Sequence, residues 1–156
     1  MIQRIVGDAL TGRKFNSSID LGCGAGDGGV LIRFHTDRLV GVDLGTSALA
    51  EAYRKEVYDE LYVGDMRTYP LGSADSVFMF DSLEHISKAD GYQLLEKIGP
   101  RFTMITTPWW SIPHPGHKCL WPITELNRLG FTTEAHSFMP DLLMTLGYGG
   151  IILAFR

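Results

Sequence analysis

Residues 19–26 read Ile-Asp-Leu-Gly-Cys-Gly-Ala-Gly, and this octet constrains the fold more than any other segment of the chain. A short apolar strand ends in an acidic residue and continues into three glycines at every second position. Such a turn lets a ligand lie against bare backbone, because glycine lacks a Cβ atom and adopts positive φ angles. The helix expected next would present unpaired N–H groups at its first turn. The octet therefore predicts a nucleoside-like ligand held over the end of a sheet.

Apolar runs alternate with segments of helical periodicity along most of the chain. We expect strands at 18–21, 39–43, 61–65, 76–80 and 102–107, and helices at 2–11, 27–34, 46–55, 90–98 and 122–129. Near-continuous apolar strands of this kind are typical of a parallel sheet covered on both faces. Residues 66–74 are too short and turn-like for a full crossover helix, and 131–138 and 149–155 are expected to be antiparallel neighbours. The predicted fold class is α/β, in one domain over residues 1–156.

The charge, the hydropathy pattern and the cysteine content limit which partners the protein can bind and in which cellular compartment it is expected. The net charge is −4 and the sequence pI is about 5.7, which argues against an extended nucleic-acid surface. The chain has no apolar run of the roughly 20 residues that a bilayer span needs, so no membrane contact is expected. Two cysteines without a signal peptide are typical of a reducing compartment. We therefore expect a cytoplasmic protein.

Four acidic residues follow apolar runs in order along the chain, namely Asp20, Asp43, Asp65 and Asp81. In an open α/β sheet, ligands bind outside the carboxyl ends of the strands. One acid after a strand often only favours a turn, but four in succession indicate a shared binding crevice. Asp43 also follows the glycines at the distance expected of a carboxylate that accepts hydrogen bonds from both ribose hydroxyls.

A dinucleotide is the main competing ligand. Gly24, Gly26 and Gly29 satisfy the G-x-G-x-x-G pattern of dinucleotide-binding turns. A dehydrogenase normally adds a separate substrate domain, however, and 156 residues leave no room for one. An acid followed by an apolar side chain, as in Asp65-Met66, also suits the amino edge and the face of an adenine. An adenosine-containing ligand other than a dinucleotide is the better prediction.

On these residues the chain resembles the class I S-adenosylmethionine-dependent methyltransferases, in their small-molecule branch. Residues 19–26 resemble the glycine-rich first motif, 40–44 the ribose-binding second motif, 64–66 the adenine-contact segment and 80–86 the fourth-strand motif. The resemblance implies a Rossmann-like, doubly wound, seven-stranded sheet that is mostly parallel with an antiparallel C-terminal strand. It also implies S-adenosyl-L-methionine as cofactor and methyl transfer to an oxygen, nitrogen or carbon atom of a small molecule.

The same resemblance assigns roles to the motif residues. The glycines admit the methionine part, the first acid orders the turn or binds the amino group through water, and the second takes the ribose hydroxyls. The third acid and its neighbour flank the adenine, and the fourth-strand residues lie beside the sulfonium. The expected cofactor-binding residues are Asp20, Gly22, Gly24, Gly26, Asp43, Leu44, Asp65, Met66, Asp81, Ser82 and Leu83.

Two histidines are candidates for a catalytic base. His85 lies at the sheet edge and His117 in the segment after the fifth strand, and imidazole titrates near neutral pH. Both residues equally suit a structural, hydrogen-bonded role. Residues 81–85 with 114–121 are also similar to metal-dependent methyltransferases of the 3′-terminal 2′-hydroxyl of small RNAs, where two acids and two histidines hold a cation. The first acid here is Asp81 instead of glutamate, and we predict metal-free chemistry.

The cover of the site is short. Trp109 and Trp110 could stack on a substrate or cover the core, whereas we expect Trp121 to be a core residue and Cys23 to be a small spacer in the turn. The N-terminal segment that covers substrate in such enzymes is only about ten residues here. We therefore expect a pocket that is either open or completed by a second copy or a partner subunit. A catalytically silent, cofactor-binding regulatory subunit is a further alternative.

Overall fold

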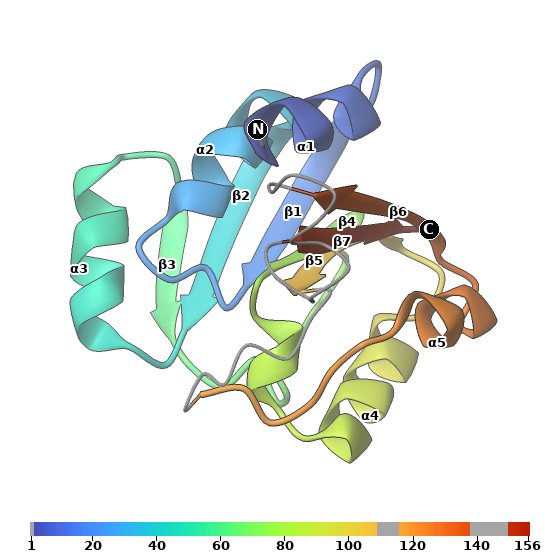
Figure 1. Ribbon diagram of the computed structural model, residues 1–156. Coiled ribbons are helices and arrows are strands. Elements are labelled where there is room, and N and C mark those ends of the chain that lie inside the picture. The colour runs from blue at the N-terminus through green and yellow to red at the C-terminus, as the bar shows by residue number, and fades with distance from the viewer. Residues whose placement is uncertain (1, 109–115, 138–149) are drawn as a thin grey trace.

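The computed structural model describes residues 2–108, 116–137 and 150–156. It contains a seven-stranded sheet in the order β3-β2-β1-β4-β5-β7-β6 (Figure 1). The strands are β1 (Phe15–Leu21), β2 (Thr36–Asp43), β3 (Glu60–Val63), β4 (Ser76–Phe80), β5 (Phe102–Pro108), β6 (Thr132–Ser137) and β7 (Gly150–Phe155). The helices are α1 (Ile2–Leu10), α2 (Asp27–Ile32), α3 (Thr46–Arg54), α4 (Lys88–Ile98) and α5 (Ile123–Arg128), with 3-10 turns η1 (Arg33–His35) and η2 (Leu83–His85).

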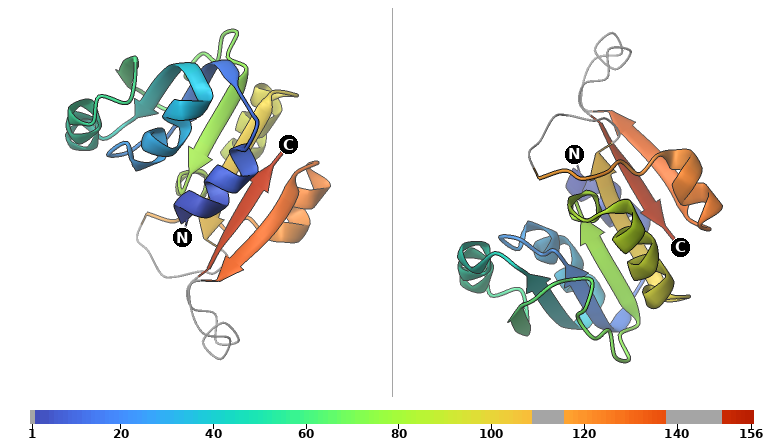
Figure 2. Two further views of the ribbon diagram at one scale, coloured as in Figure 1. Left: turned by 90° about the horizontal axis from the view of Figure 1, so that it is seen from above. Right: turned by 90° about the horizontal axis from the view of Figure 1, so that it is seen from below.

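Helices cover both faces of the sheet, as predicted. In the two views of Figure 2, α1 and α2 lie on one face and α4 and α5 on the other. Val6 and Leu10 of α1 pack with Phe78 of β4 in one core cluster. Leu94 of α4 and Trp121 belong to the cluster on the opposite face. Burial of these side chains drives the layering, at about 25 cal/mol per Å² of apolar surface removed from water.

The strand directions agree with the prediction. β1 to β5 all run parallel to one another. β7 lies between β5 and β6 and runs antiparallel to both. Residues 64–75 form no helix, and Leu71 and Ala74 fill the core there in place of a crossover helix. The fold is thus the predicted α/β, Rossmann-like, doubly wound sheet.

Several boundaries differ from the prediction. β1 begins at Phe15 and β2 at Thr36, each three residues earlier than predicted from the apolar runs. The first helix after the glycines ends at Ile32 and continues as η1. The guanidinium of Arg33 donates to the Thr36 carbonyl at 3.0 Å, which holds the chain in the turn toward β2.

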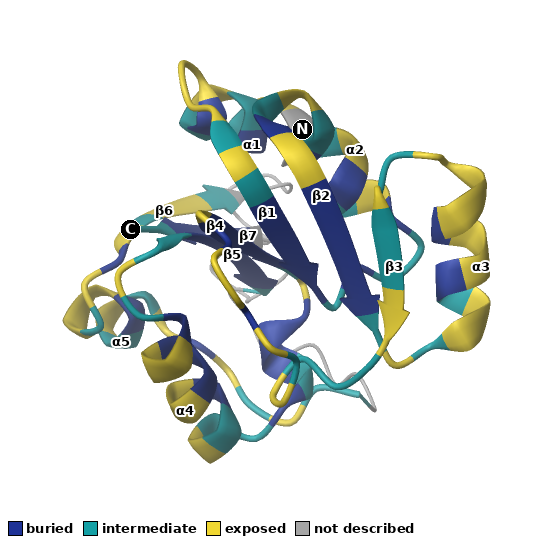
Figure 3. Ribbon diagram, turned by 180° about the vertical axis from the view of Figure 1, so that it is seen from behind, coloured by how far each residue is buried: buried dark blue, intermediate teal, exposed yellow. Residues whose placement is uncertain are grey.

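Burial rises toward the carboxyl ends of the central strands (Figure 3). The first three residues of β1 are exposed or half-buried and its last four are buried. In β2 the exposed Asp37 and Arg38 are followed by four buried residues. The strand ends that carry the predicted site therefore rest on buried residues from which water is excluded. Across the described ranges, none of the helices has both the length and the apolar character needed to cross a bilayer.

Candidate functional site

The glycine-rich turn (residues 22–26) leaves the end of β1 with positive φ angles at Gly22 (78°), Gly24 (51°) and Gly26 (88°). The turn is tied to β2, because the Gly22 and Cys23 amides both donate to the Val42 carbonyl. A Cβ atom at Gly24 would meet no described atom within 4 Å, so this position opens onto free space. The backbone of the turn is therefore exposed to a ligand, as the octet predicts.

A cavity of about 390 Å³ lies at the carboxyl ends of β1, β2, β3 and β4. Its volume is in the range of small-molecule sites. Most of the predicted site residues line it, namely Gly22, Gly24, Asp43, Leu44, Asp65, Met66, Asp81, Ser82 and His85. The topology thus brings together residues from four separate strand ends.

The other predicted residues lie elsewhere. Asp20 lines a second cavity, of about 470 Å³, on the other side of the glycine-rich turn. Gly26 lines neither cavity, since a Cβ atom there would meet Tyr58 and Ala52. Leu83 is fully buried in the core, and His117 lies beside His85 at the edge of the first cavity.

Asp43 fixes the turn as well as facing the cavity. One carboxylate oxygen accepts a hydrogen bond from the Gly24 amide at 2.9 Å, and the other accepts from the Gly45 amide at 2.7 Å. A carboxylate has about four lone-pair sites, so both oxygens keep capacity for further donors such as sugar hydroxyls.

Asp65 is held by its near neighbour in sequence. Its carboxylate accepts from the Arg67 amide and guanidinium at 2.5–3.0 Å, and Arg67 also contacts Asp90 of α4 at 3.0 Å. These hydrogen bonds lower the pKa of Asp65. The cavity wall at Asp65 is therefore an ion pair with Arg67, anchored to α4 through Asp90.

Asp81 adopts a left-handed conformation (φ 47°), which is uncommon for a residue other than glycine. Thr106 of β5 supports it, accepting from the Asp81 amide and donating to the Asp81 carboxylate at 3.1 Å. Burial raises the pKa of Asp81. The next residue, Ser82, donates to the Leu21 carbonyl at 2.8 Å and would lie 2.5 Å from a Cβ atom at Gly22. Gly22 is therefore required for close packing of two strand ends.

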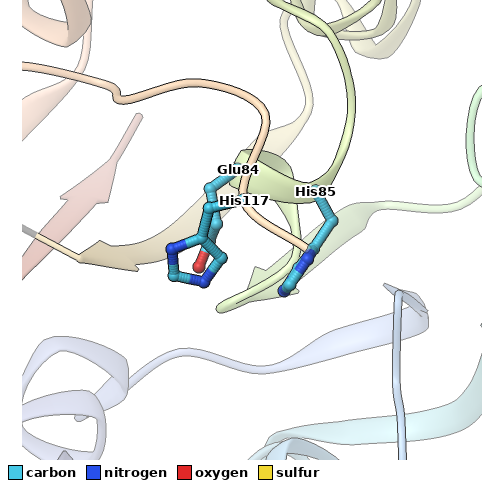
Figure 4. A group of neighbouring side chains, drawn as sticks. All are labelled: Glu84, His85 and His117. Carbon is cyan, nitrogen blue, oxygen red and sulfur yellow. The ribbon is translucent and has the colours of Figure 1, made fainter. Parts of the chain in front are cut away.

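Glu84, His85 and His117 form a compact cluster (Figure 4), in which one potential ligand atom from each residue lies within 4.8 Å of the others. The two imidazole rings meet edge to face, with centroids 5.0 Å apart. His85 Nδ1 lies 3.0 Å from the Gly116 carbonyl, and the Lys118 amide donates to the Glu84 carbonyl at 2.8 Å. These backbone contacts hold the segment 116–121 against η2.

Glu84 is fully buried, and burial raises its pKa to about 7. Thr107 donates to its Oε2 atom at 3.3 Å, while Oε1 has no hydrogen-bond partner among the described residues. A buried carboxylate with a free oxygen next to two imidazoles could hold a proton or a divalent cation.

Trp121 is fully buried, as expected of a core residue, and it contacts Gly91 of α4 so closely that a Cβ atom there would lie 2.3 Å from the ring. Cys23 is also buried, and burial raises the pKa of its thiol, which disfavours a nucleophilic role. Trp109, Trp110 and His114 lie outside the described residues.

Sequence reasoning missed Tyr58, whose hydroxyl donates to an Asp20 carboxylate oxygen at 2.7 Å. Tyr58 lies in the connection between α3 and β3, where no local motif singles it out. It also missed Thr106, which supports Asp81 from the neighbouring strand. Gly29, a glycine inside α2, lies closest to the space that the Tyr58 ring fills.

Known structures share this fold. One is a methyltransferase in complex with the Haloferax volcanii Trm112 methyltransferase activator, which superposes on this chain with a TM-score of 0.75. The two sequences are 18% identical, and the superposition covers 97% of this chain and 86% of that one. The structure titled DhpI-SAM-HEP complex gives 0.70 at 16% identity, covering 99% and 86%. The small RNA methyltransferase HEN1 gives 0.71 at 19% identity over 100% of this chain, which spans 25% of that protein.

At the sequence level, the methyltransferase domain family matches residues 19–100, from the end of β1 to the start of β5. No curated protein sequence matches the chain. The matched segment contains the glycine-rich turn and all four acids at the strand ends. The chain therefore belongs to the methyltransferase domain family and has the class I methyltransferase fold.

Proposed function

We propose that the protein binds S-adenosyl-L-methionine and transfers its methyl group to an oxygen, nitrogen or carbon atom of a small molecule. The observation that carries the proposal is the cavity at the strand ends, which collects Gly24, Asp43, Asp65 and Asp81 around a bare turn. Family membership supports the same reaction. Two free cysteines, Cys23 and Cys119, are compatible with the cytoplasmic location we expect.

In this proposal each strand end has one task. Asp43 accepts the ribose hydroxyls, Asp65 and Met66 bind the adenine, and Asp20, Asp81 and Ser82 with Gly22 and Gly24 surround the methionine part. Leu83 and Gly26, which line neither cavity, support these residues from behind. The cofactor supplies an electrophilic methyl group, so the protein has to align the acceptor and exclude water. His85 and His117 lie close enough to the cavity to take a proton from an acceptor that needs a base.

The test is transfer of radiolabelled methyl groups from S-adenosylmethionine to a panel of small phenols, amines and activated carbon acids, with EDTA-treated protein. Labelled product with at least one acceptor class is expected. His85→Ala should lower turnover with hydroxyl acceptors more than with neutral amines, because a hydroxyl group needs a base to become a good nucleophile and a neutral amine does not. Cofactor binding without transfer to any acceptor would contradict the small-molecule assignment.

A second candidate function rests on the Glu84–His85–His117 cluster. Two imidazoles and a carboxylate are standard ligands for divalent cations, and the free Glu84 Oε1 atom offers a site for one. Asp81 would supply the fourth ligand. A cation held there would activate a ribose hydroxyl, as in metal-assisted methylation of the 3′-terminal 2′-hydroxyl of RNA. The fold shared with HEN1 favours this candidate, and the net charge of −4 restricts it to an RNA terminus bound in a pocket.

Metal uptake separates the two candidates. Isothermal titration of EDTA-treated protein with Mn²⁺ should show tight binding only if the cluster is a metal site. His117→Ala would then abolish the binding, and His35→Ala, in η1 away from the cluster, would leave it unchanged. Metal-independent methyl transfer by wild type would favour the small-molecule function.

We also propose that a second copy or a partner subunit completes the site. None of the described N-terminal residues lines either cavity, and α1 packs on the sheet through Val6 and Leu10. The similar methyltransferase from Haloferax volcanii is in complex with an activator. If the chain is instead a silent regulatory subunit, purified protein will bind cofactor, retain a partner in pull-down experiments and transfer no methyl group.

A further inference from the structure

Tyr58 connects two elements that the proposed function treats separately. It lies in the connection between α3 and β3, and its hydroxyl reaches under the glycine-rich turn to the end of β1. The hydroxyl donates to Asp20 Oδ2 at 2.7 Å. Asp20 itself is 1% exposed. The contact is therefore a buried hydrogen bond between a phenol and a carboxyl group.

Three glycines from three elements make room for the Tyr58 ring. A Cβ atom at Gly29 of α2 would lie 2.4 Å from the ring, at Gly41 of β2 3.0 Å, and at Gly26 of the turn 3.1 Å. The first distance is shorter than any real contact, and the other two are tighter than most. A larger residue at Gly29 would displace the tyrosine. These three positions therefore lack a side chain where the Tyr58 ring packs.

The Asp20 carboxyl group has one satisfied and one unsatisfied oxygen. Oδ2 accepts from Tyr58, and Oδ1 is buried with no hydrogen-bond partner among the described residues. Asp20 lines the second cavity together with Gly22, Gly24 and Asp81. An unpaired buried acceptor is costly, so a ligand that brings a donor or a positive charge to this cavity would be stabilised.

We propose that Tyr58 is a positioning residue that orients the Asp20 carboxyl group, and favours its ionised form, for the ammonium group of the cofactor's amino acid part. The inference rests on the proposed function, because it assumes an S-adenosylmethionine-type ligand. A hydrogen bond from a phenol stabilises the charged form of a carboxyl group. In this low-dielectric site the charge of Asp20 would attract an ammonium group that enters the second cavity, which Asp20 lines. Tyr58 itself touches neither substrate nor cofactor.

Tyr58→Phe tests the proposal, because it removes one oxygen atom and keeps the ring between the glycines. Tyr53→Phe is the matched control, since Tyr53 is 75% exposed on α3. Two ligands are titrated by calorimetry: S-adenosylhomocysteine, which carries the amino acid part, and 5′-methylthioadenosine, which lacks it. We expect Tyr58→Phe to weaken S-adenosylhomocysteine about tenfold, equal to about 1.4 kcal/mol. Methylthioadenosine affinity should stay within about twofold, because that ligand has no ammonium group.

A double mutant distinguishes positioning from support of the fold. Asp20→Asn should show the same ligand selectivity, and adding Tyr58→Phe to it should cause little further loss of affinity. Equal weakening of both ligands by Tyr58→Phe would overturn the proposal in favour of a structural role, and so would unchanged affinity for both. If wild type binds methylthioadenosine and S-adenosylhomocysteine with equal affinity, the amino acid part contributes nothing to binding. That result would overturn the inference and leave the adenosine site intact. Wild type that binds neither ligand would overturn the proposed cofactor as well.

Discussion

Two regions of the candidate site are assembled in different ways. On the turn side, defined by the glycine-rich turn with Asp43 and Asp65, each group lies at the end of a strand or within two residues of it, and both carboxylates are held by nearby backbone amides. On the cluster side, defined by Glu84, His85 and His117, two segments more than 30 residues apart in sequence meet through a mixture of backbone and side-chain hydrogen bonds. The turn side follows from local motifs and sheet topology, whereas the cluster side depends on tertiary packing. Mutations should therefore affect the two sides differently.

The largest expected effect is on the cluster side. Trp121→Ala should lower the free energy of unfolding by about 3–5 kcal/mol, because it empties the space between α4 and η2. Chemical denaturation measures the change. Tyr53→Ala, at an exposed position, should stay within about 0.5 kcal/mol of wild type. A loss below about 1 kcal/mol for Trp121→Ala would show that the segment 116–121 is not anchored by this ring.

The next effect is on the turn side. Gly24→Val should weaken S-adenosylhomocysteine at least about 100-fold, equal to about 2.7 kcal/mol, because the new side chain enters the open space over the turn. Gly12→Val is a matched control, since Gly12 also has a positive φ angle and no described neighbour at its Cβ position. Both variants carry similar backbone strain, so an equal loss of affinity would exclude a ligand over Gly24.

Asp43→Ala should weaken cofactor binding by about 1.5–3 kcal/mol, the cost of a charge-assisted hydrogen bond. Part of the loss will come from the turn, because the Gly24 and Gly45 amides lose their acceptor. Asp37→Ala, at an exposed position of β2, should leave affinity unchanged. Calorimetry measures both. Unchanged affinity in Asp43→Ala would contradict the ribose assignment.

The most gradual effect concerns pH. Burial raises the pKa of Asp20 from 3.8 to about 7, so between these values the folded state holds a proton that the unfolded state has released. The free energy of unfolding should therefore fall as pH rises from 4 to 7, by up to about 1.4 kcal/mol per unit, and then level off. Asp20→Asn should remove this contribution.

Denaturant unfolding of wild type and Asp20→Asn across the same pH range checks the prediction. Burial also raises the pKa of Glu84 to about 7, which gives a slope of the same sign in both proteins. The difference between the two curves isolates Asp20. Parallel curves would show that Asp20 titrates alike in the folded and unfolded states.

The difference between the turn side and the cluster side also explains which parts of the fold could be predicted from the sequence. Apolar runs ending in acids identified the first four parallel strands, an apolar run without an acid identified β5, and the missing crossover helix was predicted from residues 66–74. The sheet edge then follows, because parallel strands end on the same side. The early start of β1 could not be predicted, because Phe15 is followed by polar residues whose burial depends on neighbouring strands.

The site was predictable where one motif carries it. Asp43, Asp65 and Gly24 were expected in one cavity and lie there. Tyr58 has no motif, and its partner Asp20 lies 38 residues away. Gly26 likewise satisfies a ligand-binding pattern, but its surroundings are Tyr58 and Ala52. Such contacts depend on how α3 packs against the turn, and local sequence does not encode that.

The most direct test of the central claim is calorimetric titration of EDTA-treated protein with S-adenosylmethionine, S-adenosylhomocysteine and NAD. We expect micromolar binding of the first two ligands and no binding of NAD, because we propose that the turn side binds one nucleoside that carries an amino acid part. Binding of NAD with equal affinity, or binding of neither methyltransferase ligand, would contradict it.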